Sequence, residues 1–223
     1  MVWIDLGNPY PLPEPSRYQP LVWPEGRRIA LPDDRTQASK TLPRISAERR
    51  TRYEFGPVSK SRMGALFGLT SRIQSCGNER LGFPLSRRPA PSAGAIHPIH
   101  LILNSHRDEG WHRYDPMEHA LVELPSLVQP KNVRSAMDQI VQAGDATMLL
   151  LAAEPGKTFS KYANACSLVW RDAGVLLGYF AIAAEALNLN FLPLGVTGEP
   201  WVSELVDEAG LVGVGVAFVG SAP

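Results

Sequence analysis

The chain has no excess of charge of either sign. Its 223 residues include 22 lysines and arginines and 22 aspartates and glutamates, so the formal net charge is zero. Broad nucleic-acid and anionic-membrane surfaces need a basic excess, so this balance argues against both kinds of partner. Hydrophobic residues make up 44% of the chain, which is enough to build the core of one large domain.

Cysteine is scarce. Cys76 and Cys166 lie far apart, and the chain has no C-x-x-C pair, which argues against a disulfide framework and against a zinc site. The five histidines have no neighbouring carboxylates or cysteines that would complete a metal site, so we expect structural or surface histidines. The sequence therefore predicts two reduced thiols, no metal and a cytoplasmic location.

Long apolar runs and nucleotide-binding fingerprints are also missing. The longest run, residues 175–187, is interrupted by Gly178, Tyr179 and Glu185, which is typical of a buried core helix and not of a membrane span. Asp5 brings a charge too early for a signal peptide. The absence of G-x-G-x-x-G and of a Walker loop argues against a doubly wound dinucleotide-binding fold and a nucleotide kinase.

Residues 1–44 differ from the rest of the chain in their proline content. Such a segment is expected to be extended and, because it also carries aromatic residues, to pack along a surface; a disordered leader is the alternative. We therefore expect a proline-rich extension over residues 1–44 and a folded domain over residues 45–223. The extension holds eight of the twenty prolines: Pro9, Pro11, Pro13, Pro15, Pro20, Pro24, Pro32 and Pro43.

Hydrophobic periodicity predicts a mixture of helices and strands along the folded domain. They do not alternate strictly, so the expected fold class is α+β. Asp172 is expected to begin its helix and to stabilise the N-terminus of that helix. Helices are expected over residues 59–73, 133–141, 172–187 (or from about 165) and 199–208, and strands over residues 99–104, 110–115, 120–124, 146–153, 191–196 and 211–220.

A short arginine-flanked turn is the most informative motif. Arg88 precedes Pro91, Ser92, Ala93 and Gly94, and the chain then enters an apolar strand. Small side chains leave the backbone N–H groups of such a turn uncovered, so a flat anionic or carbonyl-rich ligand can lie directly on the main chain. An ordinary loop that happens to be flanked by arginines is the alternative.

A second basic cluster lies earlier in the chain. Arg49, Arg50 and Arg52 surround Thr51, and this combination suits a phosphate, because guanidinium groups bind phosphate oxygens in pairs and the hydroxyl adds a donor. A solvated run of surface charge is the alternative.

These motifs, taken in order, resemble one protein family. Arg-Arg-Thr precedes a helix, Arg-x-x-Pro-Ser-Ala-Gly-x-x-His-Pro leads into a strand, and an Asp-Ala-Gly helix and a Pro-Leu-Gly segment follow. This order resembles the nitroreductase family of FMN-dependent oxidoreductases, and within it the SagB-type dehydrogenases, over about residues 45–220. The resemblance implies a mostly antiparallel central sheet flanked by helices, and an intertwined homodimer with FMN at its interface.

The resemblance also implies roles for particular residues. The segment Arg49–Thr51 matches the family's binding segment for the flavin phosphate and ring edge, and the turn Pro91–Gly94 matches the turn that lies against the flavin. Leu194 and Gly195 match the segment whose glycine backbone approaches the N5/O4 edge of the ring. Two departures stand out: Tyr53 replaces an arginine of the family, and no basic C-terminal segment is present. Phosphate binding would therefore rest on Arg49, Arg50 and Arg88.

Lys161 and Tyr162 resemble the Lys-Tyr pair of the SagB-type azoline oxidases, which removes a proton while flavin N5 accepts a hydride. An exposed lysine beside a packed tyrosine is the alternative. The sequence thus predicts an FMN-dependent oxidoreductase, with dehydrogenation of azoline heterocycles in a modified peptide as one activity. Two other hypotheses stay open: a general NAD(P)H-dependent nitro or quinone reductase, and a non-catalytic scaffold subunit of a peptide-modifying complex.

Overall fold

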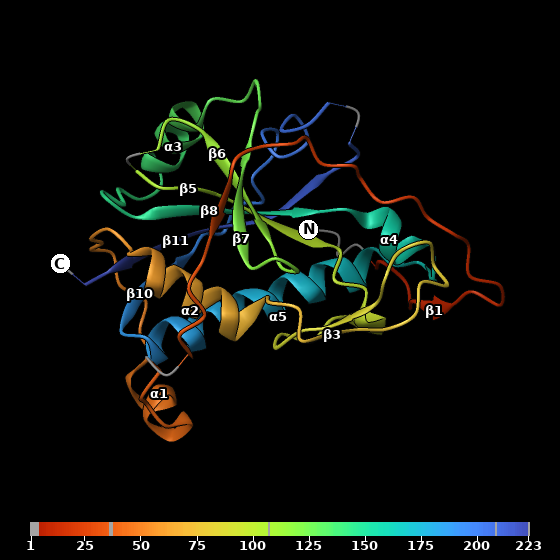
Figure 1. Ribbon diagram of the computed structural model, residues 1–223, viewed down its shortest axis with the longest axis horizontal. Helices are drawn as coiled ribbons and strands as arrows, with labels where there is room; N and C mark the ends of the chain where they lie inside the picture. The colour runs from red at the N-terminus through yellow and green to blue at the C-terminus, as the bar shows by residue number, and fades with distance from the viewer. Residues whose placement is uncertain (1–4, 36–37, 107, 208, 223) are drawn as a thin grey trace.

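A seven-stranded antiparallel sheet forms the centre of the protein (Figure 1). The computed structural model describes residues 5–35, 38–106, 108–207 and 209–222. Each strand of this sheet is antiparallel to its neighbours. Across the sheet the order is β10 (Leu189–Pro193), β11 (Val212–Ser221), β8 (Thr147–Ala153), β5 (Ile99–Asn104), β6 (Trp111–Asp115), β7 (Ala120–Leu124) and β2 (Arg28–Ala30).

Each face of the sheet is covered by a hydrophobic layer. Helices α2 (Lys60–Thr70) and α5 (Cys166–Ala186) cover one face, and α3 (Pro130–Asp138) lies on the other with the turns that follow residue 198 (Figure 1). Strand β8 lies between them with all of its residues buried, as its continuous apolar run requires. The expected α+β class, with an antiparallel sheet flanked by helices, is confirmed.

Helix α5 is the longest element and places the residues discussed below. Its inner side packs Val169, Ala173 and Phe180 into the core, where the ring of Phe180 stacks on Phe191 of β10 at 5.9 Å. By length and composition alone, α5 is also the one described helix apolar enough to cross a membrane. In this fold it is a core helix that begins at Cys166, so the earlier of its two expected starting points is the correct one.

The proline-rich N-terminal residues run along the surface and add strands to the fold. Strand β1 (Tyr10–Pro11) pairs with β9 (Tyr162–Ala163), and β2 forms the sheet edge beside β7. Helix α1 (Leu42–Glu48) follows and packs on the C-terminal end of α5. The remaining elements are short: β3 (Ser75–Cys76), β4 (Ser86–Arg87), the 3₁₀ turn η2 (Ala93–Ala95) and α4 (Pro155–Phe159).

The expected helix over residues 199–208 is wrong. Residues 199–207 form successive turns, and Glu208 lies outside the described residues. The carboxylate of Glu199 accepts hydrogen bonds from the backbone N–H and hydroxyl of Ser203 and from the backbone N–H of Gly213. Such side-chain to backbone bonds compete with helix formation. The apolar side chains of Val202 and Leu205 are nevertheless buried, which produced the helical pattern in the sequence.

Candidate functional site

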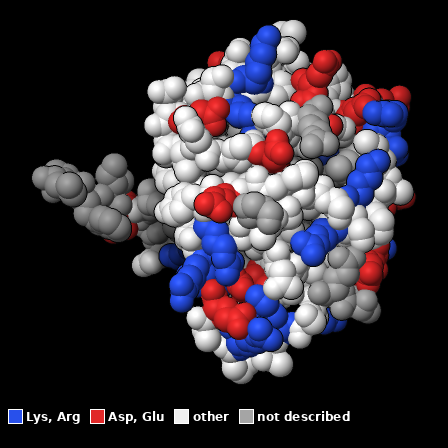
Figure 2. Space-filling model, turned by 90° about the vertical axis from the view of Figure 1, so that its left-hand side faces the viewer, with Lys and Arg blue, Asp and Glu red and all other residues white. Residues whose placement is uncertain are grey.

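The first arginine cluster lies at the C-terminal end of α5. Arg49, Arg50 and Thr51 follow α1 directly and are exposed. Within the described part of the chain, neither Arg49 nor Arg50 has a side-chain hydrogen bond or ion pair. Figure 2 shows this side of the molecule, where lysines and arginines gather around acidic side chains at the level of α1. Two exposed guanidinium groups beside an exposed hydroxyl, with no partner among the described residues, have the donors that a phosphate group needs.

Arg52 is used differently from its neighbours. Its guanidinium lies 2.8 Å from Glu185, whose other carboxylate oxygen lies 2.5 Å from the ammonium group of Lys40. Glu185 is only 2% exposed. Burial alone would raise the pKa of Glu185, but the hydrogen bonds and charges of Arg52 and Lys40 lower it. Arg52 therefore anchors this segment to α5, and Arg49 and Arg50 remain available for a ligand.

The Pro-Ser-Ala-Gly turn is held near the other end of α5 by Asp172. The hydroxyl of Ser92 donates to Asp172 at 2.5 Å and accepts the backbone N–H of His97 at 2.9 Å, and the backbone N–H of Ala93 donates to Asp172 at 3.0 Å. Gly94 has φ +64°, a conformation that favours glycine. Since α5 begins at Cys166, Asp172 lies inside the helix, and its expected role at the N-terminus was wrong.

Lys161 and Tyr162 lie directly beside this turn, although they are distant from it in sequence. A β-carbon added to Gly94 would lie 2.8 Å from both Lys161 Nζ and Tyr162 Oη. The N-terminal residues fix the backbone of Lys161 and Tyr162. Strand β1 pairs with β9, and the backbone N–H of Leu12 donates to the carbonyl of Lys161 at 2.9 Å. The structure thus brings together the turn and the Lys-Tyr pair, two motifs that the sequence indicated separately.

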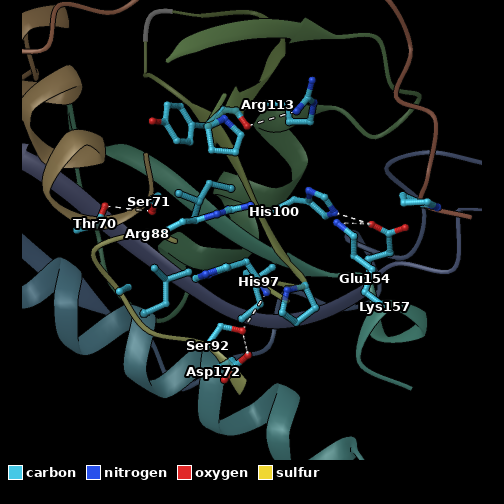
Figure 3. A pocket seen from close by; sticks show the side chains of 18 of the residues that line it. Thr70, Ser71, Arg88, Ser92, His97, His100, Arg113, Glu154, Lys157 and Asp172 are labelled. Atoms are coloured by element: carbon cyan, nitrogen blue, oxygen red, sulfur yellow. Dashed lines mark hydrogen bonds and ion pairs between the residues drawn. The ribbon is translucent and has the colours of Figure 1, made fainter. Parts of the chain in front are cut away.

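A cavity of about 230 Å³ opens behind the turn, between α5, the sheet and the N-terminal residues (Figure 3). Leu21 and Trp23 close one side of it, and Trp23 packs edge-on against His100 at 4.9 Å. The lining is unusually rich in ionisable groups. Its charged or titratable side chains are Arg88, His97, His100, Arg113, Glu154, Lys157 and Asp172, together with Tyr114.

The two histidines of the cavity are neutral near pH 7. Burial, reinforced by the charge of Arg88, lowers the pKa of His97 to about 3. Burial also lowers the pKa of His100 to about 4, so its neutral ring donates to Glu154 over 2.8 Å. Burial alone would raise the pKa of Glu154, but the hydrogen bond from His100 and the nearby Lys157 lower it to about 2. Glu154 also accepts the backbone N–H of Leu21 at 2.6 Å, which ties down the N-terminal residues.

Leu194 and Gly195 follow β10 at the edge of the sheet. Leu194 packs into the hydrophobic layer on the α3 side, and its backbone N–H donates to Val216 at 2.8 Å. Gly195 is exposed, and a β-carbon added there would have no atom within 4 Å. Its backbone is therefore open to a ligand.

Apart from Leu194 and Gly195, the predicted residues fall into two groups at opposite ends of α5. Asp172 holds the turn at one end of the helix, the turn end. Glu185 holds the segment of Arg49 and Arg50 at the other end, the arginine end, 13 residues further along the chain. At 1.5 Å per residue this separation is about 20 Å. Figure 1 shows α1 at one end of α5, and β1, β3 and α4 at the other. Arg88 lies in the cavity at the turn end, so within one chain it is not beside Arg49 and Arg50.

Several residues of the cavity were not indicated by the sequence. Glu154 and Lys157 form a local ion pair three residues apart, and the antiparallel pairing of β5 with β6 and β8 brings Arg113 to the same cavity. The role of Asp172 as the anchor of the turn was also missed. Both depend on contacts between distant segments, for which a single sequence carries no local signal.

Comparison with solved structures identifies the architecture. A candidate nitroreductase from Ralstonia eutropha JMP134 superposes with a TM-score of 0.71 at 19% identity, covering 95% of this chain and 99% of that one. The fold is that of the nitroreductases. A chain of the E. coli microcin synthetase McbBCD complex, solved with truncated pro-MccB17 bound, gives a TM-score of 0.62 at 17% identity, over 79% of this chain and 70% of that one.

A third structure with the nitroreductase fold contains bound FMN. A candidate nitroreductase from Desulfovibrio desulfuricans, solved in complex with FMN, gives a TM-score of 0.52 at 16% identity and covers 82% of this chain and 87% of that one. No protein-family model matches the sequence, and no curated protein matches it either. Identities this low establish a shared fold and leave the activity to be argued from the site.

Proposed function

We propose that the protein is an FMN-dependent oxidoreductase that acts as a homodimer. The observation that carries the proposal is the turn end of α5, where a bare Pro-Ser-Ala-Gly backbone lies against an amine and a phenol. The unpaired Arg49 and Arg50 supply the phosphate site that such a cofactor needs. The FMN complex among the structures that share this fold supports the choice of flavin.

The residues present fit FMN in three respects. Arg49, Arg50 and Thr51 would hold its phosphate, the small turn would lie against its ring system, and the open backbone of Gly195 would face the ring edge. When bound, FMN supplies a two-electron centre that accepts or donates a hydride. Protein groups around such a cofactor set its position and the charge next to it.

Lys161 and Tyr162 are assigned the proton chemistry. Dehydrogenation of a C–H/N–H or C–H/C–H pair releases one hydride and one proton, and the hydride leaves with both electrons of its bond. Lys161 or Tyr162 would receive the proton, since both lie at the surface of the turn. We propose, as the specific activity, dehydrogenation of azoline rings in a modified peptide, in line with the SagB-type resemblance and the microcin synthetase chain of like fold.

A second copy of the chain would complete the site. The outward side of α5 carries Trp170, Val175, Tyr179 and Ile182, which are 37–44% exposed although they are large and apolar. Gly174 and Gly178 lie on the same side, with open space around them. If a second α5 crosses this surface in the opposite direction, the arginine end of one chain approaches the turn end of the other. The two half-sites, about 20 Å apart in one chain, would then form one flavin site across the interface.

The test is the visible absorption spectrum of purified protein, before and after FMN is added, with size-exclusion chromatography. We expect flavin bands that co-elute with a dimer and are lost in Arg49→Ala/Arg50→Ala. The matched control is Arg27→Ala/Arg28→Ala, another adjacent pair, whose members form exposed ion pairs with Glu123 and Asp115. Flavin retained by Arg49→Ala/Arg50→Ala would refute the phosphate assignment, and colourless wild-type protein would favour the scaffold hypothesis.

Turnover assays separate the two enzymatic hypotheses. NADPH oxidation with a nitroarene is the activity expected of a general reductase, which the nitroreductase fold favours. Oxygen uptake with an azoline peptide is expected of the proposed dehydrogenase. Lys161→Ala should keep flavin bound and lower azoline turnover, while Lys131→Ala, an exposed lysine of α3, should change neither. An unchanged rate in Lys161→Ala would remove the Lys-Tyr assignment.

A further inference from the structure

The cavity behind the turn contains a cation that has no counter-ion among the residues the structure describes. Arg88 is half-buried, and its Nε donates to the hydroxyl of Ser86 at 3.1 Å. No carboxylate of the described residues forms an ion pair with its guanidinium group. Burial lowers the pKa of Arg88 to about 10, which still leaves the group charged near pH 7. A desolvated charge with no partner is costly, and proteins generally retain one where a ligand supplies the opposite charge.

The acidic groups around the cavity are already engaged. Glu154 accepts hydrogen bonds from His100 and from the backbone of Leu21. Asp172 accepts hydrogen bonds from Ser92 and Ala93. Neither carboxylate is therefore free to move to Arg88, and the neutral His97 beside Arg88 adds no charge of its own.

Two further cations face the same space. Lys157 lies 3.6 Å from Glu154 and over the ring of Phe83, and Arg113 lies 3.7 Å from Asp115 and over the ring of Trp23. Burial lowers the pKa values of both Lys157 and Arg113. Lys157 is thus paired with Glu154 and Arg113 with Asp115, so among the described residues Arg88 is the cation of the lining that has no ion-pair partner.

The rest of the lining is apolar. Leu21, Ile99, Leu101 and Leu176 contribute aliphatic surface, and Trp23 and Tyr114 add aromatic surface. A single free guanidinium fork in such surroundings suits a group with one negative charge on two oxygens better than a phosphate, which requires more donors. A ligand of this kind would present a carboxylate to Arg88 and an apolar body to the wall formed by α5 and β5.

We propose that this cavity is a binding site for a small organic monocarboxylate, held by Arg88. The cavity is lined by none of Arg49, Arg50, Gly195 or Lys161, and Arg88 is thereby reassigned from the flavin phosphate to this ligand. The cavity shares Pro91 and Ser92 with the turn, so a bound carboxylate would lie next to the proposed flavin surface. The inference requires neither FMN nor turnover, and it can be tested by binding alone.

The test is isothermal titration calorimetry of the full-length protein with cyclohexanecarboxylate, and with cyclohexanecarboxamide as the uncharged analogue. We expect the carboxylate to bind and the carboxamide to bind at least about tenfold more weakly, because a charge-assisted hydrogen bond is lost. Arg88→Gln should weaken carboxylate binding by the same factor. The matched control is Arg87→Gln, the adjacent and exposed arginine, which should bind as the wild type does.

Each other outcome overturns the proposal. No heat of binding at millimolar carboxylate, equal binding of the carboxamide, or unchanged affinity in Arg88→Gln would each exclude the site. Preferential binding of inorganic phosphate would make it a phosphate site instead, and displacement of the carboxylate by FMN would make the cavity part of the flavin site. If Arg88→Gln does not fold, Arg88→Lys replaces it, because lysine keeps the charge but lacks the planar pair of donors. We then expect carboxylate affinity to fall at least about threefold. Unchanged affinity in Arg88→Lys would overturn the proposal.

Discussion

Two buried carboxylates on α5 have opposite environments. Asp172, at the turn end, is held by the hydroxyl of Ser92 and the backbone N–H of Ala93, and burial raises its pKa. Glu185, in the last turn of the helix, lies between Lys40 and Arg52, whose hydrogen bonds and charges lower its pKa against the effect of burial. One carboxylate fixes a backbone through neutral donors, and the other fixes a segment through ion pairs.

The different partners of Asp172 and Glu185 determine which cations at each end of α5 are available to a ligand. At the turn end, neutral donors satisfy Asp172, and the nearby cation Arg88 has no counter-ion within the described part of the chain. At the arginine end, Glu185 uses Lys40 and Arg52, and Arg49 and Arg50 remain exposed beyond it. The stability from Glu185 is present above its unfolded-state pKa and is lost as the pH falls through its lower native value. Asp172 has the opposite sign, because the folded state favours its protonated form.

The largest expected effect is at Glu185. Glu185→Ala leaves Lys40, whose side chain is 11% exposed, without its buried partner, and should lower the free energy of unfolding by about 3 kcal/mol. Urea denaturation at fixed protein concentration measures this change. Glu48→Gln removes the exposed partner of Lys40 and should cost less than about 1 kcal/mol. Equal costs for the two variants would contradict the role of Glu185 as the anchor.

Loss of Asp172 should lower the free energy of unfolding less than loss of Glu185 does. Asp172→Ala leaves the Ser92 hydroxyl and the Ala93 N–H without an acceptor and should cost about 2 kcal/mol. Asp172→Asn keeps one acceptor and removes the buried charge, so it should cost less than about 1 kcal/mol. Denaturation of both variants checks the prediction, and a greater loss in the asparagine variant would show that the charge itself is needed.

The neutral state of His97 predicts an acid-sensitive turn end. Its native pKa of about 3 lies below the unfolded value of 6.5, so the unfolded state binds the proton first and stability falls as the pH falls below 6.5. This residue alone should contribute a loss of about 1 kcal/mol between about pH 6 and pH 5. Comparison of His97→Gln with the wild type isolates that contribution. His106→Gln, at an exposed histidine, is the matched control for the substitution itself.

The smallest effect concerns the outward side of α5. In an isolated chain, Gly174→Ala should stabilise the helix by about 0.5 to 1 kcal/mol, since a β-carbon there meets no atom within 4 Å. In a dimer packed on this side, the same methyl group would approach the partner and weaken association. Analytical ultracentrifugation distinguishes the two cases, and Ile182→Glu should disrupt the dimer, whereas Ile140→Glu, at another exposed isoleucine, should not.

The sequence predicted those parts of the fold that depend on local patterns. The strands over residues 99–104 and 120–124 match the structure, and β8 follows from its apolar run. The same use of apolar spacing failed over residues 199–208, where it predicted a helix. There the carboxylate of Glu199 accepts hydrogen bonds from Ser203 and Gly213 and stabilises turns.

The candidate site was only partly predictable, for a related reason. The turn and the Lys-Tyr pair have recognisable sequences, yet their contact at Gly94 could not be derived from either motif alone. The cavity behind them depends on polar side chains contributed by β5, β6 and α4 and on a wall formed by residues 20–23. Which of these side chains line one cavity can be predicted only when the pairing of the distant strands is known.

The central claim is that each flavin site combines the arginine end of one chain with the turn end of another. The most direct test co-expresses Arg49→Ala/Arg50→Ala and Gly94→Val chains with different tags, purifies the mixed dimer and measures its bound FMN. We predict that neither variant holds FMN alone and that the mixed dimer holds one FMN per dimer, because one of its sites receives both intact halves. A mixed dimer without FMN would contradict the claim, since both halves would then have to come from the same chain.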